Sequence, residues 1–88
     1  MNTYIVYALY SEKYNKIYIG YTSNLDQRIL SHNILSKKGW TRKYRPWEVF
    51  YTEEFTSKSE AIVREKYLKS GVGRKFIKQQ LEHWKERQ

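Results

Sequence analysis

An arginine and a histidine, Arg28 and His32, stand four positions apart in a segment whose leucines and isoleucines repeat with helical spacing. On a helix, side chains four positions apart lie next to each other on one face. The forked guanidinium donors of Arg28 match the oxygens of a phosphate group. The nearby cation should lower the pKa of His32 and leave a neutral imidazole that can accept a proton. The alternative is that the arginine stem packs while its head reaches water, and that His32 is an ordinary surface histidine.

Glu65 falls inside the apolar stripe that Ala61, Ile62 and Leu68 form on a later predicted helix. A carboxylate held against apolar neighbours costs on the order of several kcal/mol unless a cation or hydrogen-bond donors satisfy it. Two alternatives stay open. The carboxylate pairs with a nearby arginine or lysine at the rim, or it binds a metal ion, since Mg²⁺ sites often use few protein carboxylates.

Tyr7 and Tyr18 lie in two segments that we expect to pair as strands, which lets both hydroxyls meet at one end of a sheet. A tyrosine beside a cation or a metal loses its proton more readily and can then act as a base. Most strand tyrosines belong to the core or to the sheet surface. The sequence does not decide which of the two is the base.

The elements that must position these side chains follow from the hydrophobic pattern. Residues 4–10 form a continuous apolar run, typical of a strand buried on both faces, and residues 17–21 form a second strand that stops near Gly20. The connection between them is short and offers Asn15 as a turn residue. This predicts an antiparallel hairpin, because a parallel pair needs a long crossover.

A first helix begins at one of two possible N-caps, Ser23 or Asn24, and ends at about residue 35. Residues 39–46 show neither helical nor strand periodicity and are predicted to be a basic, aromatic loop. A weak alternation over residues 47–55 predicts a third strand.

Two helices follow this strand. A capping box at Ser57 predicts a helix over residues 58–70, which Gly71 ends in a left-handed conformation. The last helix starts at Gly73, and residues 85–88 are expected to fray. The sequence therefore predicts an α+β fold: a three-stranded antiparallel sheet flanked by helices, in the order strand, strand, helix, strand, helix, helix.

The length of 88 residues predicts one domain, with its core at about residues 3–84. The sequence contains no cysteine, which excludes a disulfide framework and a cysteine-based zinc site. The longest apolar run is too short for a signal peptide or a membrane span. We therefore expect a cytoplasmic protein without a membrane partner.

The net charge of +8 favours a polyanionic partner, with nucleic acid ahead of an anionic membrane. The alternative is that the charge only keeps the surface soluble. Basic residues interspersed with aromatic ones suit phosphate contacts combined with base stacking. The candidate nucleic-acid contacts are Lys37, Lys38, Trp40, Arg42, Lys43, Arg45, Arg74 and Lys75.

Several of these stretches together resemble a known family. Residues 5–7, reading IVY, followed by residues 18–20, reading YIG, resemble the two-part motif that names the GIY-YIG endonuclease superfamily. Arg28, His32 and Glu65 follow at fitting distances, and the resemblance extends over about residues 3–77. The chain is most similar to small single-domain members, related to the nuclease domain at the N-terminus of the C component of excinuclease.

The resemblance implies a three-stranded sheet flanked by helices, with one divalent metal ion, Mg²⁺ or Mn²⁺, on Glu65. Tyr7 or Tyr18 would act as the base or orient the attacking water. Arg28 would stabilise charge on the phosphate, and His32 would assist the tyrosine. The chain departs from the family pattern in the first motif, which reads Ile-Val-Tyr, and in a last helix that has only glutamines where some members carry an asparagine.

The first hypothesis is thus a metal-dependent endonuclease that hydrolyses DNA phosphodiester bonds, in DNA repair or recombination. The alternative is a nucleic-acid-binding module of the same fold with little or no cleavage activity. DNA is the expected partner and RNA stays open. We expect a monomer, and a separate protein partner is an option for targeting.

Overall fold

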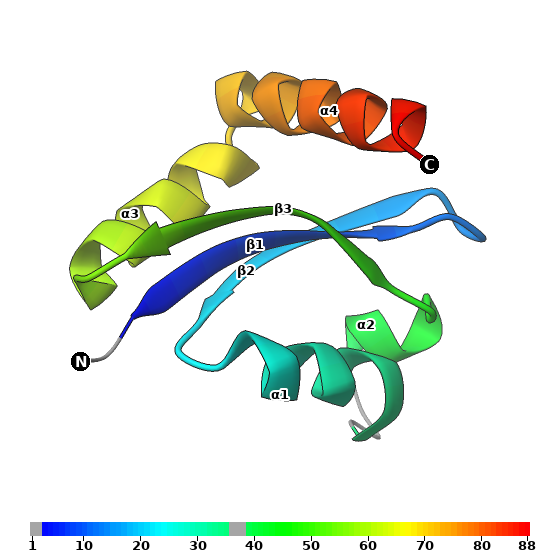
Figure 1. The fold of residues 1–88 in the computed structure, drawn as a ribbon, viewed down its shortest axis with the longest axis horizontal. Helices are drawn as coiled ribbons and strands as arrows, with labels where there is room; N and C mark the ends of the chain where they lie inside the picture. The colour runs from blue at the N-terminus through cyan, green and yellow to red at the C-terminus, as the bar shows by residue number, and fades with distance from the viewer. Residues whose placement is uncertain (1–2, 36–38) are drawn as a thin grey trace.

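The computed structural model describes residues 3–35 and 39–88. A three-stranded antiparallel sheet carries helices on both faces (Figure 1). The predicted fold class and element order are confirmed, with one short helix added. The strands, in the spatial order β2-β1-β3, are β1 (Tyr4–Ser11), β2 (Lys16–Thr22) and β3 (Glu48–Phe55), and the helices are α1 (Leu25–Leu30), the π-helical turn η1 (Ser31–Leu35), α2 (Trp40–Lys43), α3 (Lys58–Lys69) and α4 (Gly71–Glu86).

The central strand β1 pairs antiparallel with both of its neighbours. It is buried from Val6 to Ser11, as the continuous apolar run predicts. The predicted hairpin with β2 is confirmed, and Asn15 adopts a positive φ of 53° in its turn. The Asn15 side chain accepts a hydrogen bond from the Tyr10 hydroxyl at 3.1 Å, which ties the turn to the strand.

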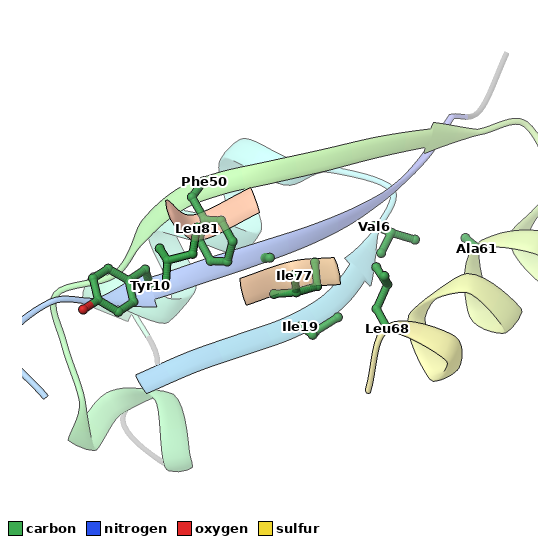
Figure 2. Close-up of a cluster of buried hydrophobic side chains, with 9 residues drawn as sticks. Val6, Tyr10, Ile19, Phe50, Ala61, Leu68, Ile77 and Leu81 are labelled. Carbon is green, nitrogen blue, oxygen red and sulfur yellow. The ribbon is translucent and has the colours of Figure 1, made fainter. Parts of the chain in front are cut away.

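Side chains of β1 alternate between two hydrophobic clusters, one on each face of the sheet. Val6 and Ala8 pack with Leu68 of α3 and Ile77 of α4 on the face shown in Figure 2. Tyr7 and its neighbours on the opposite face pack with Leu25 and Ile29 of α1 and with Trp47 and Tyr44. Within the described ranges, no helix has the length and apolar character needed to cross a bilayer.

Two expectations for residues 24–46 need correction. The first helix does reach Leu35, but its second half is the π-helical turn η1, which places His32 in the core. Residues 40–43 of the predicted loop form the single-turn helix α2. In α2, the Trp40 ring lies 4.7 Å from the Tyr44 ring and 5.6 Å from the Trp47 ring, between centroids. Aromatic packing therefore stabilises a turn that has no helical periodicity in sequence.

The junction of the last two helices also differs from expectation. Gly71 has no positive φ and begins α4, while Ser70 ends α3 and caps α4 by accepting a hydrogen bond from the Gly73 backbone N–H at 3.3 Å. The C-terminal residues were expected to fray, but α4 continues to Glu86. Contacts of Trp84 with the Tyr10 ring explain this, since they fix the last turns against the sheet.

Gly20 of β2 lies directly opposite Tyr7 of β1, and the strand continues beyond it to Thr22. A β-carbon at residue 20 would lie 2.7 Å from the Tyr7 hydroxyl oxygen and 2.9 Å from Tyr7 Cζ. The missing side chain therefore leaves the space in which the Tyr7 phenol lies over the neighbouring strand.

The substitution Gly20→Ala should destabilise the protein by about 1–3 kcal/mol, because the added methyl group overpacks a fully buried ring. Urea unfolding measures this change. Gly71→Ala is the matched control: no atom lies within 4 Å of the position that its β-carbon would take and its φ is not positive, so its stability should stay equal or rise. Equal stability of the two variants would contradict the steric role of Gly20.

Candidate active site

Three of the predicted site residues, Tyr7, Arg28 and His32, meet at the buried hydroxyl of Tyr7. His32 Nε2 lies 2.9 Å from Tyr7 Oη in a hydrogen bond whose direction depends on the imidazole tautomer. Arg28 Nε donates to the same oxygen at 3.4 Å. Tyr7 has no exposed surface, and His32 is 6% exposed. Arg28 and His32, four positions apart, thus both contact one strand tyrosine.

Burial controls protonation at this cluster. The pKa of His32 falls from 6.5 to about 4, chiefly because the imidazole is buried, with Arg28 and Arg45 adding to the effect. The predicted direction is confirmed, although burial rather than Arg28 is the largest cause. Burial raises the pKa of Tyr7 to about 12 and outweighs the hydrogen bond from Arg28. The neighbouring cation lowers the pKa of Tyr7 as expected, but the net shift is upward, so Tyr7 is a weaker acid than an ordinary tyrosine.

The turn η1 that carries His32 is fixed by side chains from the following segment. Arg45 Nε donates to the His32 carbonyl at 2.5 Å, and Arg45 Nη2 donates to the Ser31 carbonyl at 3.2 Å. The Asn33 side chain exchanges two hydrogen bonds with the Trp47 backbone, at 2.7 and 3.0 Å. These contacts hold the imidazole in place before any ligand binds.

A polar cavity of about 460 Å³ lies at the exposed edge of the sheet, along β2. Tyr18 of β2, Arg28 of α1 and Glu65 of α3 line it together. Helix α1 covers one face of the sheet and α3 the other (Figure 1), so the cavity forms where the two helical layers meet at the edge strand. Tyr7 is buried in the core, whereas Tyr18 borders the cavity and is partly exposed.

The Glu65 side chain is 16% exposed and forms an ion pair with Lys69, at 3.5 Å between Oε1 and Nζ. This is the rim pairing that sequence analysis left open. The described residues contain no group of three or more histidine, cysteine, aspartate or glutamate side chains that could enclose a metal ion. Three residues that carry hydroxyl groups, Tyr18, Thr22 and Ser23, line the same cavity as Glu65, and the Thr22 hydroxyl is hydrogen-bonded to the Asn24 backbone. A site with one carboxylate and other oxygen donors fits Mg²⁺. In proteins this ion usually keeps several water ligands and takes others from the phosphate oxygens of a substrate.

The predicted nucleic-acid contacts occupy different surroundings. Trp40 is 47% exposed, and its ring stacks on that of Tyr18 at 6.3 Å between centroids. Lys43 lies over the ring of Tyr44 at 5.6 Å. The Trp40 ring therefore extends an aromatic surface outward from the cavity residue Tyr18, with a lysine beside it.

The other predicted contacts that the structure describes lie in α2, between α2 and β3, and in α4. Arg45 holds the carbonyls of η1, as described above. Arg42 is exposed on α2, and Arg74 and Lys75 are exposed near the start of α4. Lys37 and Lys38 lie outside the described residues.

Sequence analysis missed two contributors to the site. Lys58 lines the polar cavity from the first turn of α3, and Gly20 makes room for Tyr7. The capping box at Ser57 signals where α3 starts, but only the packing of α3 along β2 brings its first residue to the cavity.

Comparisons with known proteins identify the class to which this domain belongs. Residues 3–80 match the GIY-YIG catalytic domain, so the chain belongs to the GIY-YIG family, as the motifs predict. The family implies a nuclease, and GIY-YIG nucleases act on DNA.

Several relatives carry the designation UPF0213. A UPF0213 protein of Limosilactobacillus reuteri is 35% identical over 82 residues, covering 91% of this chain and 84% of the relative. Another, from Staphylococcus haemolyticus, is 43% identical over 58 residues, covering 66% of this chain and 71% of the relative. The solution NMR structure of a UPF0213 protein from Bacillus halodurans superposes with a TM-score of 0.52 at 30% identity, covering 85% of this chain and 81% of that one.

The lowered pKa of His32 predicts a pH-dependent stability. The unfolded imidazole binds a proton near pH 6.5 and the folded one only near pH 4, so stability is complete above pH 6.5 and decreases as the pH falls toward 4. The loss should be on the order of 2–3 kcal/mol. Urea unfolding across this range measures it, with His32→Gln as the comparison variant. An equally steep profile in that variant would contradict the assignment to His32.

Proposed function

We propose that the protein is a divalent-metal-dependent endonuclease that hydrolyses phosphodiester bonds in DNA. The observation that carries the proposal is the polar cavity, where Tyr18, Arg28 and Glu65 converge from three separate elements. A phenol, a guanidinium and a carboxylate in one open cavity are the groups that phosphodiester hydrolysis uses. Family membership supports the same reaction class.

Charge stabilisation is the main contribution of the protein itself. Arg28 keeps its positive charge, because its hydrogen bond to Tyr7 raises its pKa, and Lys58 adds a second cation to the cavity. Negative charge develops on the phosphate oxygens during attack, and fixed cations stabilise that charge more strongly in a partly enclosed site than in water. Tyr7 and His32 limit the motion of Arg28 from its buried side.

Tyr18 is the phenol that can meet the attacking water, because it borders the cavity and Tyr7 does not reach the surface. The Tyr18 ring also lies 4.8 Å from the His32 ring, between centroids. A phosphate beside Arg28 offsets the cation that contributes to the low pKa of His32. Substrate binding would therefore raise the pKa of His32 toward its ordinary value, although burial, the larger cause, would still hold it down.

Glu65 would hold the divalent ion, Mg²⁺ or Mn²⁺, together with the hydroxyl groups that line the cavity. Such an ion, when bound, supplies Lewis-acid polarisation of a phosphate oxygen and stabilises the leaving oxygen. The exposed surface of Trp40, Lys43 and Tyr44 would bind the DNA beyond the cavity through stacking and phosphate contacts.

One observation favours a second candidate function, a DNA-binding module that does not cut. Glu65 is already paired with Lys69, and a carboxylate neutralised by a lysine has less need of a metal ion. Incubating the protein with single-stranded, duplex and branched DNA, and with RNA of matched sequence, separates the two functions. Products that form with Mg²⁺ or Mn²⁺ and vanish with chelator identify a nuclease.

Arg28→Ala and Glu65→Ala should each lower the cleavage rate by about two or more orders of magnitude, because each removes a charge that acts on the reacting phosphate. Initial rates on one DNA substrate measure the loss. Glu54→Gln, at an exposed position of β3, is the matched control and should cut at the wild-type rate. Retained cleavage in either cavity variant would overturn this assignment of the site.

Changing each of the two tyrosines to phenylalanine should affect stability and cleavage rate differently. Tyr7→Phe leaves His32 and Arg28 without their common partner and should cost about 1–3 kcal/mol of stability. Tyr18→Phe should leave stability nearly unchanged while lowering the cleavage rate. Paired unfolding and rate measurements test this, and a Tyr18→Phe enzyme with full activity would contradict the proposed role.

A further inference from the structure

A second cavity, of about 250 Å³, lies where β2 meets the junction of α3 and α4. We name it the flanking cavity. Its apolar wall consists of Ile17, Ile19 and Ile77. Its remaining lining includes three cations and no carboxylate: Lys69 from the end of α3, and Arg74 and Lys78 from α4.

Two residues connect the flanking cavity to the polar cavity. Tyr18 borders both of them. Lys69 lines the flanking cavity and forms an ion pair with Glu65, which lines the polar cavity. The two cavities are therefore neighbours along the same edge of the sheet, separated by a tyrosine and an ion pair.

Two of the three cations of the flanking cavity remain available to an anion. Among residues 3–35 and 39–88, no carboxylate lies within ion-pair distance of Arg74 or Lys78. Arg74 Nε donates to the Lys69 carbonyl at 3.1 Å, which holds the guanidinium at the cavity. Arg74 and Lys78 stand four positions apart on α4, so their like charges disfavour each other without a bound anion.

The position of the cavity at the start of α4 adds to its positive potential. Helix α4 is 16 residues long, and its first turn carries no acidic residue. The N-terminal end of such a helix bears a partial positive charge. Two available cations, Arg74 and Lys78, together with the helix end and an apolar wall match a nucleotide, whose phosphate would contact the two cations while its sugar contacts the isoleucines.

We propose that the flanking cavity binds the nucleotide adjacent to the scissile phosphate. This inference rests on the proposed function, and it identifies the substrate as a polynucleotide strand that extends along β2 rather than a single phosphate ester. The cavity acts as a subsite: its contacts fix which phosphate of the strand enters the polar cavity beside Arg28 and Glu65.

The first test measures binding of single-stranded and duplex DNA of one sequence, in chelator so that nothing is cut. The Arg74→Gln, Lys78→Gln double variant should bind more weakly, and its slope of log K against log salt should decrease by about 1.4–1.8, since each lost phosphate contact contributes about 0.7–0.9. Lys66→Gln, an exposed position of α3 outside the lining of both cavities, is the charge-matched control and should keep the wild-type slope. Thermal unfolding verifies that the variants remain folded.

The second test locates the subsite with DNA strands that carry one neutral methylphosphonate at a chosen position, cut in Mg²⁺. In the wild-type protein, a neutral linkage next to the cut bond should suppress cutting there. In the double variant that adjacent suppression should disappear, while suppression at the scissile linkage itself remains.

These outcomes distinguish the subsite from the proposed function. A double variant with the salt slope of Lys66→Gln, or with undiminished adjacent suppression, overturns the subsite and leaves the nuclease in place. If the double variant has a reduced salt slope but the wild-type protein cuts no DNA, the phosphate contacts are supported and the proposed nuclease activity is overturned. A wild-type protein that binds neither DNA overturns both.

Discussion

The buried hydroxyl of Tyr7 is the constraint on which the site depends. A phenol oxygen without exposed surface needs hydrogen-bond partners, and leaving it unpaired costs more than the net gain of an ordinary hydrogen bond. His32 and Arg28 are its partners, so the helical segment that carries both must lie against β1 at this point. The satisfied hydroxyl thereby orients Arg28 toward the edge of the sheet, and Gly20 supplies the space for it.

Arg28 and Glu65, which come from helices on opposite faces of the sheet, both line the cavity at its β2 edge. Helix α1 packs on one face and α3 on the other, so Arg28 and Glu65 lie on helices that belong to separate hydrophobic clusters and can meet only around a strand edge (Figure 1). Strand β2 is such an edge, and both cavities lie along it. Cations lining an exposed edge also discourage its pairing with another strand. The same arrangement thus serves folding and would serve the proposed phosphate binding.

Sequence reasoning succeeded where local periodicity decides the structure. The continuous apolar run of residues 4–10 and the short hairpin placed Tyr7 and Tyr18 in paired strands, and helical spacing grouped Arg28 with His32. The π-helical turn and α2 could not be predicted, because they depend on contacts of Arg45 and Trp47 from outside their own segments. The high pKa of Tyr7 was missed for a related reason: the sequence shows the neighbouring cation, but not the complete burial that outweighs it.

Several features that disfavour folding lie in or next to the polar cavity. Glycine weakens a strand interior, yet Gly20 lies within β2. A π-helical turn has poorer geometry than the helix that it replaces, and η1 buries a histidine whose pKa is shifted to about 4. Arg28 and Lys58 add two like charges to one cavity. The cluster on the opposite face of the sheet is built from apolar side chains (Figure 2), although the buried hydroxyl of Ser11, at the end of β1, has no hydrogen-bond partner among the described residues. Because such costs persist mainly where a surface must bind or react, those that lie near the polar cavity support, independently of the family motifs, the proposal that the reaction takes place at the β2 edge.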